Sequence, residues 1–422
     1  MFRSAMSALA RRGRHSASGS CRSRPRLETM EDRCVPAHLI VNSPADNINQ
    51  PGTLRYAVAL ANNGDTIDIQ TTQTIMLTHG ELYLAHSVTI DFLGVSDQGV
   101  ATISGDHLSR IFEVAPTAHD NLVFLRLIEG NGHARPMGIG GAAPADGYGG
   151  AILNQGTLAL SECSVLGSIA RDLTGFGEGG GIYNNGISNR FNTPAVGALT
   201  LTKCLLALNG TAVGGGIFNG GGNVSLSQCV VDSNGADHEG GGISNRGGTT
   251  TVVSSEFDNN VAASFGAYGG ALANVSGPSI PSSTLLVYGS NFRFNSGGEG
   301  GAITNFSYGV NTAFLGVFGC GFYNSTATDG AAINNLDYGL MVVVGSIFVQ
   351  NTATGNGGAI ANDYFSTAAV LMCQMIDNTA LHGGGIFNNG VLSLGFSLLQ
   401  TNTPDNLDNH GTYNDLGFNT FI

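Results

Sequence analysis

The sequence predicts an all-β fold, a single-stranded parallel β-helix (a solenoid) with a short N-terminal capping helix. Three observations predict it. A glycine-rich box recurs nine times. The segments between the boxes carry the same residue types at the same spacing, and a short segment with a helical pattern precedes the repeats.

The box reads Gly-Gly-(Ala/Gly)-(Ile/Leu)-x-Asn, and its closing asparagines follow one another after 26 to 35 residues. A period of this length is typical of an elongated array in which each unit buries its apolar face against its neighbours. The boxes occupy 149–154, 179–184, 214–219, 240–245, 269–274, 300–305, 330–335 (a weaker copy), 357–362 and 383–388.

Between boxes, each repeat has a β-rich run that ends in a polar residue, with an apolar residue three positions earlier and Cys or Ser five positions earlier. The apolar column is Val165, Leu206, Val231, Phe257, Phe292, Phe322, Phe348, Met375 and Leu399. The small column is Cys163, Cys204, Cys229, Ser255, Ser290, Cys320, Ser346, Cys373 and Ser397. The polar column is Ser168, Asn209, Asn234, Asn260, Asn295, Ser325, Asn351, Asn378 and Asn402. Positions two apart on a strand share a face, so the first two columns should both point inward.

Stacked β-coils place each side chain about 4.8 Å from its equivalent in the next coil, which explains why like residues recur. Small Cys or Ser would fit where the tube is narrow, and Phe, Leu or Val would fill its wider part. The paired glycines allow sharp turns between strands. The asparagines can form ladders of amide hydrogen bonds along the stack and satisfy backbone groups that the turns leave free.

The region before the repeats predicts how the array begins. Residues 38–42 should form a first strand, residues 53–61 an amphipathic helix with Thr53 as its N-cap, and residues 64–69 a second strand. The helix would cover strand edges that would otherwise be open to other chains. Further strands are predicted at 75–77, 88–90, 102–104, 111–114 and 122–127. The domains are therefore a basic leader (1–37), a cap with the first coils (38–148), the repeats (149–403) and a closing segment (404–422).

The boxes, together with runs such as Phe257–Asn260, resemble the GGA(I/L) and FxxN repeats of polymorphic outer-membrane proteins and of β-helix passenger proteins of environmental bacteria. The resemblance covers residues 149–403. It implies a right-handed, pectate-lyase-like β-helix that is exported to the cell surface or beyond and is often linked to adhesion. Those proteins end in a membrane β-barrel, whereas about twenty residues follow the last repeat here, so self-anchoring by that route is not expected.

The leader is rich in Arg and has no continuous apolar stretch, so it does not read as an ordinary secretory signal. Residues 24–37 resemble the LExLExRxxPA leader of planctomycete extracytoplasmic proteins, which implies a secreted or surface location. The matching residues are Leu27, Glu28, Met30, Glu31, Arg33, Pro36 and Ala37. The alternative is a disordered basic tail. No segment is long and apolar enough to predict a membrane span.

The net charge of the chain bears on which kinds of partner it can bind. The total charge is −13, and residues 1–37 hold eight Arg against three acidic residues. Removing that +5 leaves −18 on the remainder, which argues against nucleic acid and other polyanions as partners. Of the seven cysteines, five lie in the small column and should fill core positions; Cys21 and Cys34 have no predicted role. Without CxxC or paired His spacing, no metal site is predicted.

A polysaccharide lyase or glycoside hydrolase is the main alternative, because β-helices also include such enzymes. That chemistry needs clustered carboxylates with Arg or Lys. The candidates are Asp65, Asp68, Asp91 and Asp106, with Arg110 and Arg126. We expect Asp65 to cap backbone groups and Asp68 and Asp91 to face solvent. The acids of the repeats, Asp232, Glu239, Glu256, Asp258 and Glu299, are expected to form no column, so no catalytic residue is assigned. An enzyme should instead bring acids and a basic residue of three adjacent coils within about 6 Å.

No cofactor is predicted, because the glycine runs never form GxGxxG between a strand and a long helix and because GGxGxD is absent. Histidines His79, His86, His107 and His238 are expected in loops. Trp is absent, leaving Tyr148, Tyr183, Phe218 and Phe387 as weaker surfaces for stacking sugars. The sequence thus predicts a secreted or surface, non-catalytic, adhesin-like scaffold that binds glycans or surface proteins. Specificity would come from the variable inserts 132–147, 172–177, 187–198 and 276–283. A structural cell-envelope protein is a further alternative, and the oligomeric state is left open.

Overall fold

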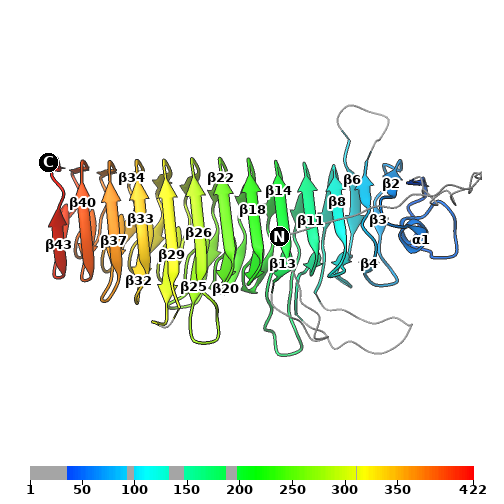
Figure 1. The fold of residues 1–422 in the computed structure, drawn as a ribbon, viewed down its shortest axis with the longest axis horizontal. Coiled ribbons are helices and arrows are strands. Elements are labelled where there is room, and N and C mark those ends of the chain that lie inside the picture. The colour runs from blue at the N-terminus through cyan, green and yellow to red at the C-terminus, as the bar shows by residue number, and fades with distance from the viewer. Residues whose placement is uncertain (1–35, 93–98, 133–146, 187–196, 310) are drawn as a thin grey trace, which may run out of the picture. The chain divides into compact units, whose positions relative to one another are not determined.

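The computed structural model describes residues 36–92, 99–132, 147–186, 197–309 and 311–422. Residues 36–422 form one compact unit. In it, coil after coil stacks along one axis (Figure 1). Three long sheets of 14, 12 and 13 strands, here named A, C and B, run along the stack, and their neighbouring strands pair in parallel. The predicted parallel β-helix is confirmed. At about 4.8 Å per strand, 14 strands span on the order of 60 Å.

Sheet A contains β1 (His38–Val41), β2 (Thr66–Ile69), β5 (Thr89–Asp91), β8 (His119–Val123), β11 (Thr157–Ser161), β14 (Ala198–Thr202), β18 (Asn223–Ser227), β22 (Thr249–Val253), β26 (Ser283–Tyr288), β29 (Ala313–Phe318), β33 (Leu340–Val344), β37 (Thr367–Leu371), β40 (Val391–Gly395) and β43 (Thr412–Asp415). Sheet B contains β3 (Ile75–Met76), β6 (Ala101–Ser104), β9 (Leu125–Ile128), β12 (Ser164–Leu166), β15 (Leu205–Ala207), β19 (Val230–Asp232), β23 (Glu256–Asp258), β27 (Asn291–Arg293), β30 (Gly321–Tyr323), β34 (Ile347–Val349), β38 (Gln374–Ile376), β41 (Leu398–Gln400) and β44 (Thr420–Phe421).

Sheet C contains β4 (Leu82–Leu84), β7 (Phe112–Val114), β10 (Ile152–Asn154), β13 (Ile182–Asn185), β17 (Ile217–Gly220), β21 (Ile243–Arg246), β25 (Leu272–Ser276), β28 (Ile303–Ser307), β32 (Ile333–Leu336), β36 (Ile360–Asn362), β39 (Ile386–Asn388) and β42 (Leu407–Asn409). Two short sheets lie between B and C in the chain order. They are formed by β16 (Gly210–Val213), β20 (Gly235–Glu239) and β24 (Val261–Ala262), and by β31 (Thr326–Ala327) and β35 (Thr352–Ala353).

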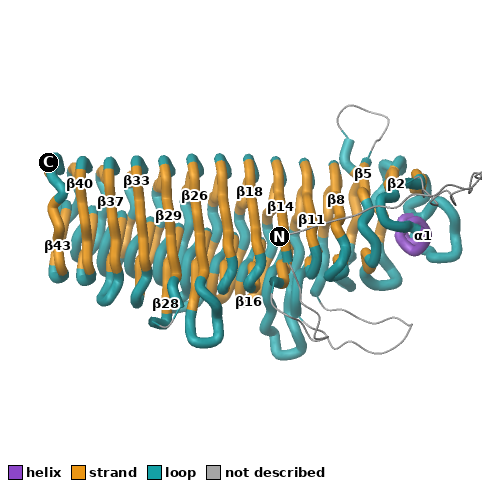
Figure 2. Tube along the Cα trace, viewed as in Figure 1, coloured by secondary structure: helices purple, strands orange, loops and turns teal. Residues whose placement is uncertain are grey.

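The predicted capping helix is α1 (Leu54–Leu60), which lies at one end of the stack (Figure 2). Thr53 is its N-cap, as predicted, and the Thr53 hydroxyl accepts a hydrogen bond from the Tyr56 amide at 3.3 Å. Leu54 and Ala57 are buried against the first coil. Burial thus explains why a helix of seven residues is stable at this position.

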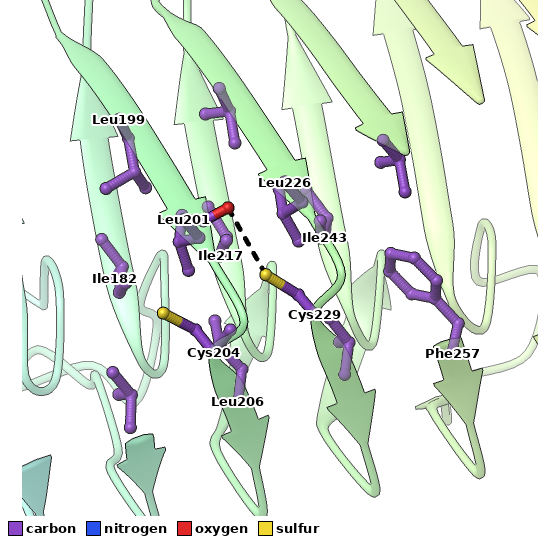
Figure 3. Close-up of a cluster of buried hydrophobic side chains, with 14 of the residues drawn as sticks. Ile182, Leu199, Leu201, Cys204, Leu206, Ile217, Leu226, Cys229, Ile243 and Phe257 are labelled. Carbon is purple, nitrogen blue, oxygen red and sulfur yellow. Dashed lines mark hydrogen bonds between the residues drawn. The ribbon is translucent and has the colours of Figure 1, made fainter. Parts of the chain in front are cut away.

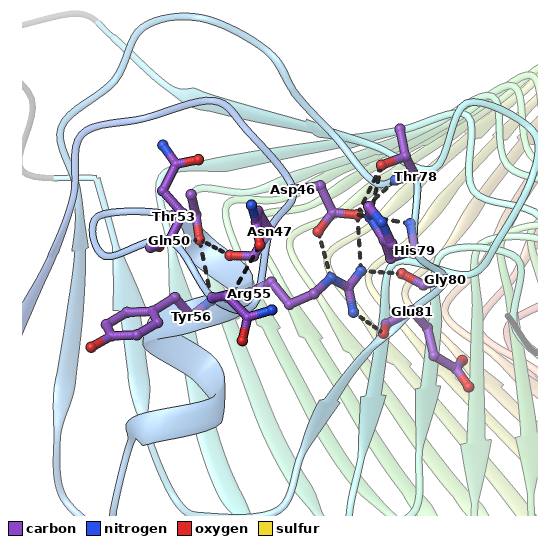
Figure 4. A network of polar contacts seen from close by, with 11 residues as sticks. Asp46, Asn47, Gln50, Thr53, Arg55, Tyr56, Thr78, His79, Gly80 and Glu81 are labelled. Atoms are coloured by element: carbon purple, nitrogen blue, oxygen red, sulfur yellow. Dashed lines mark hydrogen bonds and ion pairs between the residues drawn. The ribbon is translucent and has the colours of Figure 1, made fainter. Parts of the chain in front are cut away.

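A buried carboxylate ties the loop before α1 to the first coil (Figure 4). Asp46 pairs with Arg55 at 2.5 Å and accepts hydrogen bonds from the amides of Thr78 and His79 at 2.7 and 2.8 Å. Burial opposes the charged form, but the bonds from Arg55 and from these amides prevail and hold the pKa of Asp46 below its usual value. The network fixes the cap with charge-assisted hydrogen bonds.

The strands predicted before the repeats are present, with two differences. The predicted strand 122–127 is two strands, β8 and β9, because Phe124 adopts a left-handed conformation with φ of 54° and turns the chain from sheet A to sheet B. Strand β4 was not predicted. The closing segment 404–422 forms the last coil, in which β42, β43 and β44 pair with β39, β40 and β41.

The columns read from the sequence are in register. Val165 pairs with Leu206, and the pairing continues through Phe292 and Phe322 to Leu399. The apolar column is fully buried, and its phenylalanine rings stack at 4.8 to 5.0 Å. The cysteines of the small column are buried and free, and Cys204 and Cys229 point into the core among leucine and isoleucine side chains (Figure 3). Their predicted core role is confirmed.

Both predicted asparagine ladders are present. From Asn154 to Asn409, each box asparagine donates its amide to the next one at 2.6 to 2.9 Å. The polar column forms a second ladder, as from Asn209 to Asn234 at 2.9 Å. These side chains also bind backbone carbonyls, such as that of Gly248. Buried polar groups of the turns are thereby satisfied.

The first glycine of all nine boxes has a positive φ, between 57° and 72°. At Gly240, a Cβ atom would lie 2.2 Å from the carbonyl oxygen of Ile243. The box therefore requires glycine for both conformation and space, which explains its recurrence.

Candidate binding strip on the outer face of sheet C

The outer face of sheet C is partly covered by the chain that leads into each box. In each strand, the box isoleucine and asparagine point into the core, so the residue between them and the residue after the asparagine point outward. The residue just before several of the boxes contacts these outward side chains. For example, Ser244 donates to the Glu239 carboxylate at 3.4 Å. The side chains that meet here form what we call the sheet C strip.

The residues that precede the boxes form a column of their own. Pairing in register joins Tyr148, Glu178, Val213, Glu239, Tyr268, Glu299 and Asp329. The expectation that the acids of the repeats form no column is therefore wrong for Glu239 and Glu299. It is also wrong for Asp232 and Asp258, which are paired neighbours in sheet B. These acids share columns because of how the coils pair, and no repeated residue type in the sequence indicates it.

Two glutamates of this column meet one arginine. Arg246 donates to both oxygens of Glu239, at 2.7 Å from Nε and 2.5 Å from Nη2. Its Nη1 lies 3.8 Å from the Glu178 carboxylate. Glu178 precedes β13 and Arg246 ends β21, and the coil of β17 lies between them. In that coil, the residue that pairs with Arg246 is Gly220, which has no side chain to block the contact. We call Glu178, Glu239 and Arg246 the Arg246 cluster.

The environment of the Arg246 cluster changes how its groups ionise. Burial raises the pKa of Glu178 to about 7, with the Arg246 charge acting against the shift and the Glu239 charge adding to it. Burial opposes the charge on Arg246, but hydrogen bonds and charge from Glu239 prevail and raise the pKa of Arg246. Near neutral pH, Glu178 can therefore hold or release a proton beside a fixed ion pair.

An aromatic ladder borders the Arg246 cluster. The rings of Tyr148 and Tyr183 lie 4.8 Å apart, and those of Tyr183 and Phe218 lie 5.1 Å apart and are stacked. The Arg246 guanidinium lies 5.8 Å from the Phe218 ring centre. Three of the four aromatic residues that the sequence offered for stacking are thus brought together. The fourth, Phe387, lies farther along the strip.

Farther along, the strip has a second acidic group and a second set of rings. Glu299 lies near Asp329 and Asp363, and burial, with their charges adding to it, raises the pKa of Glu299 to about 7. The Tyr268 and Phe306 rings stack at 5.0 Å. Tyr308 of the same coil is exposed and contacts the buried Phe306 ring at 4.4 Å. Exposed rings follow on the next two coils, where Phe365 lies 4.7 Å from Tyr338 and 4.0 Å from Tyr364.

The candidates chosen from the sequence lie elsewhere. Asp65 accepts backbone hydrogen bonds from Ala37 and Asn62, at 2.6 and 2.8 Å, and so caps backbone groups as predicted. Asp68 and Asp91 are paired neighbours on sheet A. The expectation that they face solvent is wrong for Asp68, which is 6% exposed and accepts a hydrogen bond from the Gln70 side chain at 2.7 Å. Asp91 is half-buried.

The two predicted basic partners do not join those aspartates. Arg110 is 1% exposed and pairs with Glu81 at 2.8 Å and Glu113 at 3.8 Å, so it neutralises acids next to sheet C. Arg126 is exposed on β9 of sheet B. Asp106 is half-buried in a turn with φ of 50°. Glu178 and Arg246 were missed, since only the coil register links two residues so far apart in the chain.

His79, His86 and His107 lie in loops as predicted, but His238 lies in β20. All four are exposed. Within the described ranges, no group of three or more His, Cys, Asp or Glu side chains could hold a metal ion. The same ranges contain no helix that is long and apolar enough to cross a membrane. The inserts 172–177 and 276–283 are described, whereas most of the leader and most of the inserts 132–147 and 187–198 lie outside the described residues.

Comparisons with protein families, with curated proteins and with solved structures find no match to this chain.

Proposed function

We propose that this protein is a secreted or cell-surface β-helix scaffold that binds linear glycans along the sheet C strip. The observation that carries the proposal is the alternation of stacked rings and carboxylates over successive coils of one face. Aromatic faces pack against the apolar faces of sugar rings, and carboxylates and amides accept hydrogen bonds from hydroxyl groups. A polymer with repeating units can contact equivalent positions on several coils, so weak contacts add up.

Two features support this assignment. The insert 172–177 lies beside the start of the strip, since the Phe176 carbonyl and the Asp172 amide approach Gly147, next to Tyr148. Leu173 and Phe176 are exposed there and can extend the contact surface. The resemblance of residues 24–37 to an extracytoplasmic leader supports the location outside the cytoplasm.

A glycan-cleaving enzyme is the second candidate, and the Arg246 cluster favours it. Glu178 comes from one coil, and Glu239 and Arg246 come from the second coil after it. Arg246 lies within 3.8 Å of both carboxylates, so two acids and a basic residue converge as such an enzyme needs, although the coil between them contributes none of the three. A carboxyl with a pKa of about 7 suits a general acid, and an ionised carboxylate beside it suits a base or nucleophile. Glycan binding remains our preferred function, because the Arg246 ion pair engages both oxygens of Glu239.

The Tyr183→Ala variant should bind the preferred glycan about two- to tenfold more weakly, because a ring stack of this kind contributes roughly 0.5–1.5 kcal/mol. The measurement is a glycan and polysaccharide array, followed by titration of the best ligand. Tyr288→Ala is the matched control, since Tyr288 stacks on Phe318 at 5.1 Å but belongs to sheet A. Equal losses in both variants would contradict the strip, and a lack of any glycan ligand would favour a structural envelope role.

The same array distinguishes an enzyme from a binder when released products are analysed. The binding proposal expects no oligosaccharide release from any polysaccharide. If the enzyme hypothesis holds, products appear with the unmodified protein and fall at least a hundredfold with Glu178→Gln, because general acid catalysis contributes about 10²–10⁴-fold. Glu162→Gln serves as the control, since Glu162 is exposed and pairs with Lys203 outside the strip.

A further inference from the structure

A cavity of about 240 Å³ opens on the sheet C strip over β32, β36 and β39. This volume has room for several water molecules or for one small polar group of a ligand. Its lining residues are Asp329, Asn334, Leu336, Asn356, Ala361, Asp363 and Phe387. Two carboxylates and two amides thus face an opening that has one aromatic residue in its wall.

Asn334 presents an unused acceptor in this lining. The residue is 1% exposed, and its Nδ2 donates to the Glu299 carboxylate at 2.8 Å. In this orientation of the amide, Nδ2 serves Glu299 and Oδ1 is left for another donor. The Asn334 Oδ1 is buried and has no hydrogen-bond partner. Buried acceptors are almost always paired, so this oxygen points to a donor that a ligand would bring.

The charges around the cavity define what kind of donor fits. Glu299 lies near both Asp329 and Asp363, and the Asp363 charge also acts on Asp337. Arg246 is already paired with Glu239 and Glu178. Two histidines next to the cavity, His382 and His410, contact Asp408 at 3.5 and 2.9 Å. An acidic cavity of this kind favours a cation that carries hydrogen-bond donors, which describes a protonated amine.

Aromatic rings next to the cavity suit the same ligand. Asp337 is followed by Tyr338, and Asp363 is followed by Tyr364 and Phe365, whose rings form an exposed group beside the acids. Such rings attract cations through their faces and pack against sugar rings. Exposed rings, carboxylates and an amide oxygen without a partner thus occur together, and this combination suits a sugar that carries an amine.

We propose that this cavity binds the protonated amino group of an amino sugar, so that the glycan bound by the strip is one with free amines. The binding of a sugar chain rests on the proposed function, whereas the binding of an amine in the cavity does not. The net charge of −18 on residues 38–422 adds long-range attraction for such a polycation.

The test compares three oligosaccharides by calorimetric titration of the full chain at about pH 5.5, which is low enough to protonate most of the sugar amines. They are a β-1,4-linked glucosamine hexamer, its fully N-acetylated counterpart and cellohexaose. The glucosamine hexamer should bind at least tenfold more tightly than the other two. The double variant Asp329→Asn and Asp363→Asn should lose this preference. The control, Asp405→Asn with Asp415→Asn, removes the same charge from exposed positions of the last coil and should keep it.

The possible failures can be told apart. Equal binding of all three hexamers would overturn the amine inference and leave glycan binding intact. Equal loss of preference in the double variant and in its control would overturn the cavity as the site, since overall charge would then explain binding. If no hexamer binds but n-propylammonium shifts the NMR signals of Asn334 and Phe387, the amine site stands and the proposed glycan function fails. Unchanged thermal unfolding of the variants shows that the fold is kept.

Discussion

Phe322→Ala is expected to lower the free energy of unfolding by about 3–5 kcal/mol, the range for removing a fully buried Phe side chain. Phe322 is 0% exposed, and its ring stacks between those of Phe292 and Phe348, each at 4.8 Å. The loss therefore combines buried area with two ring contacts. The coil register holds the neighbouring rings in place, so they cannot collapse into the space that the substitution leaves.

Urea unfolding followed by circular dichroism measures the effect, with hydrogen exchange at β27, β30 and β34 to localise it. Solenoids often unfold in parts, so the local measurement guards against a transition that is not two-state. Phe294→Ala is the control, because Phe294 is 56% exposed and only two residues from Phe292. It should change stability by less than about 0.5 kcal/mol. Similar losses for Phe294 and Phe322 would contradict the assignment of the inward column.

The inward columns could be predicted because stacking repeats one environment at every coil. A position that must hold a small residue shows Cys or Ser in each repeat, as at Cys229, and a wide position shows Phe, as at Phe257. The box glycines and ladder asparagines were predictable for the same reason, since turn conformation and amide pairing each restrict the choice to one or two residue types. Physical constraint on the core therefore leaves a visible pattern in a single sequence.

The turns from sheet A to sheet B left no such pattern. Residues as different as Glu162, Lys203, Met372 and Phe396 adopt a left-handed conformation there, with φ between 52° and 55°. Their side chains point away from the core, so no residue type is required at this position. The strand boundary within residues 122–127 was missed for this reason, because Phe124 occupies the same turn.

The candidate site was hidden by a related effect. The residue before each box varies between Tyr, Glu, Val and Asp, so the column containing Glu178 and Glu239 has no repeated identity. Which of these residues meets Arg246 depends on the exact stacking of coils whose lengths differ. Sequence spacing gives a coil only its approximate place, whereas a contact of 3.8 Å between Arg246 and Glu178 needs the register itself.

Asp120→Asn is expected to stabilise the protein increasingly as the pH rises, with a gain on the order of 3 kcal/mol between pH 5 and pH 8. Asp120 is 1% exposed and points into the core at the position that Leu158 occupies in the next coil. One carboxylate oxygen accepts a hydrogen bond from the Val88 amide at 2.8 Å, and the other has no partner.

The direction of this pH dependence follows from which state, folded or unfolded, binds the proton on Asp120 more tightly. Burial raises the pKa of Asp120 from 3.8 to about 7, although the Val88 hydrogen bond opposes the shift. The folded state therefore holds the proton over a range of pH in which the unfolded state has released it. Stability consequently falls as the pH rises from about 4 to about 7, and the cost is fully present above that range. The pKa values of Glu178 and Glu299 are also raised to about 7, so these groups also lower stability as the pH rises. Their effect cancels when the unmodified protein is compared with Asp120→Asn, because both proteins contain them.

Chemical unfolding at several pH values measures this difference, and a second variant separates the charge from the hydrogen bond. Asp120→Asn keeps an acceptor for the Val88 amide, whereas Asp120→Leu matches the neighbouring coil but leaves that amide unpaired. Both variants should therefore lose the pH dependence due to Asp120, and the Leu variant should be the less stable by about 1–3 kcal/mol. A stability difference between the unmodified protein and Asp120→Asn that stays constant from pH 5 to pH 8 would mean that the core does not raise the pKa of this carboxyl. In that case the inward position of Asp120 would be wrong, because a carboxylate at a core position cannot ionise without cost.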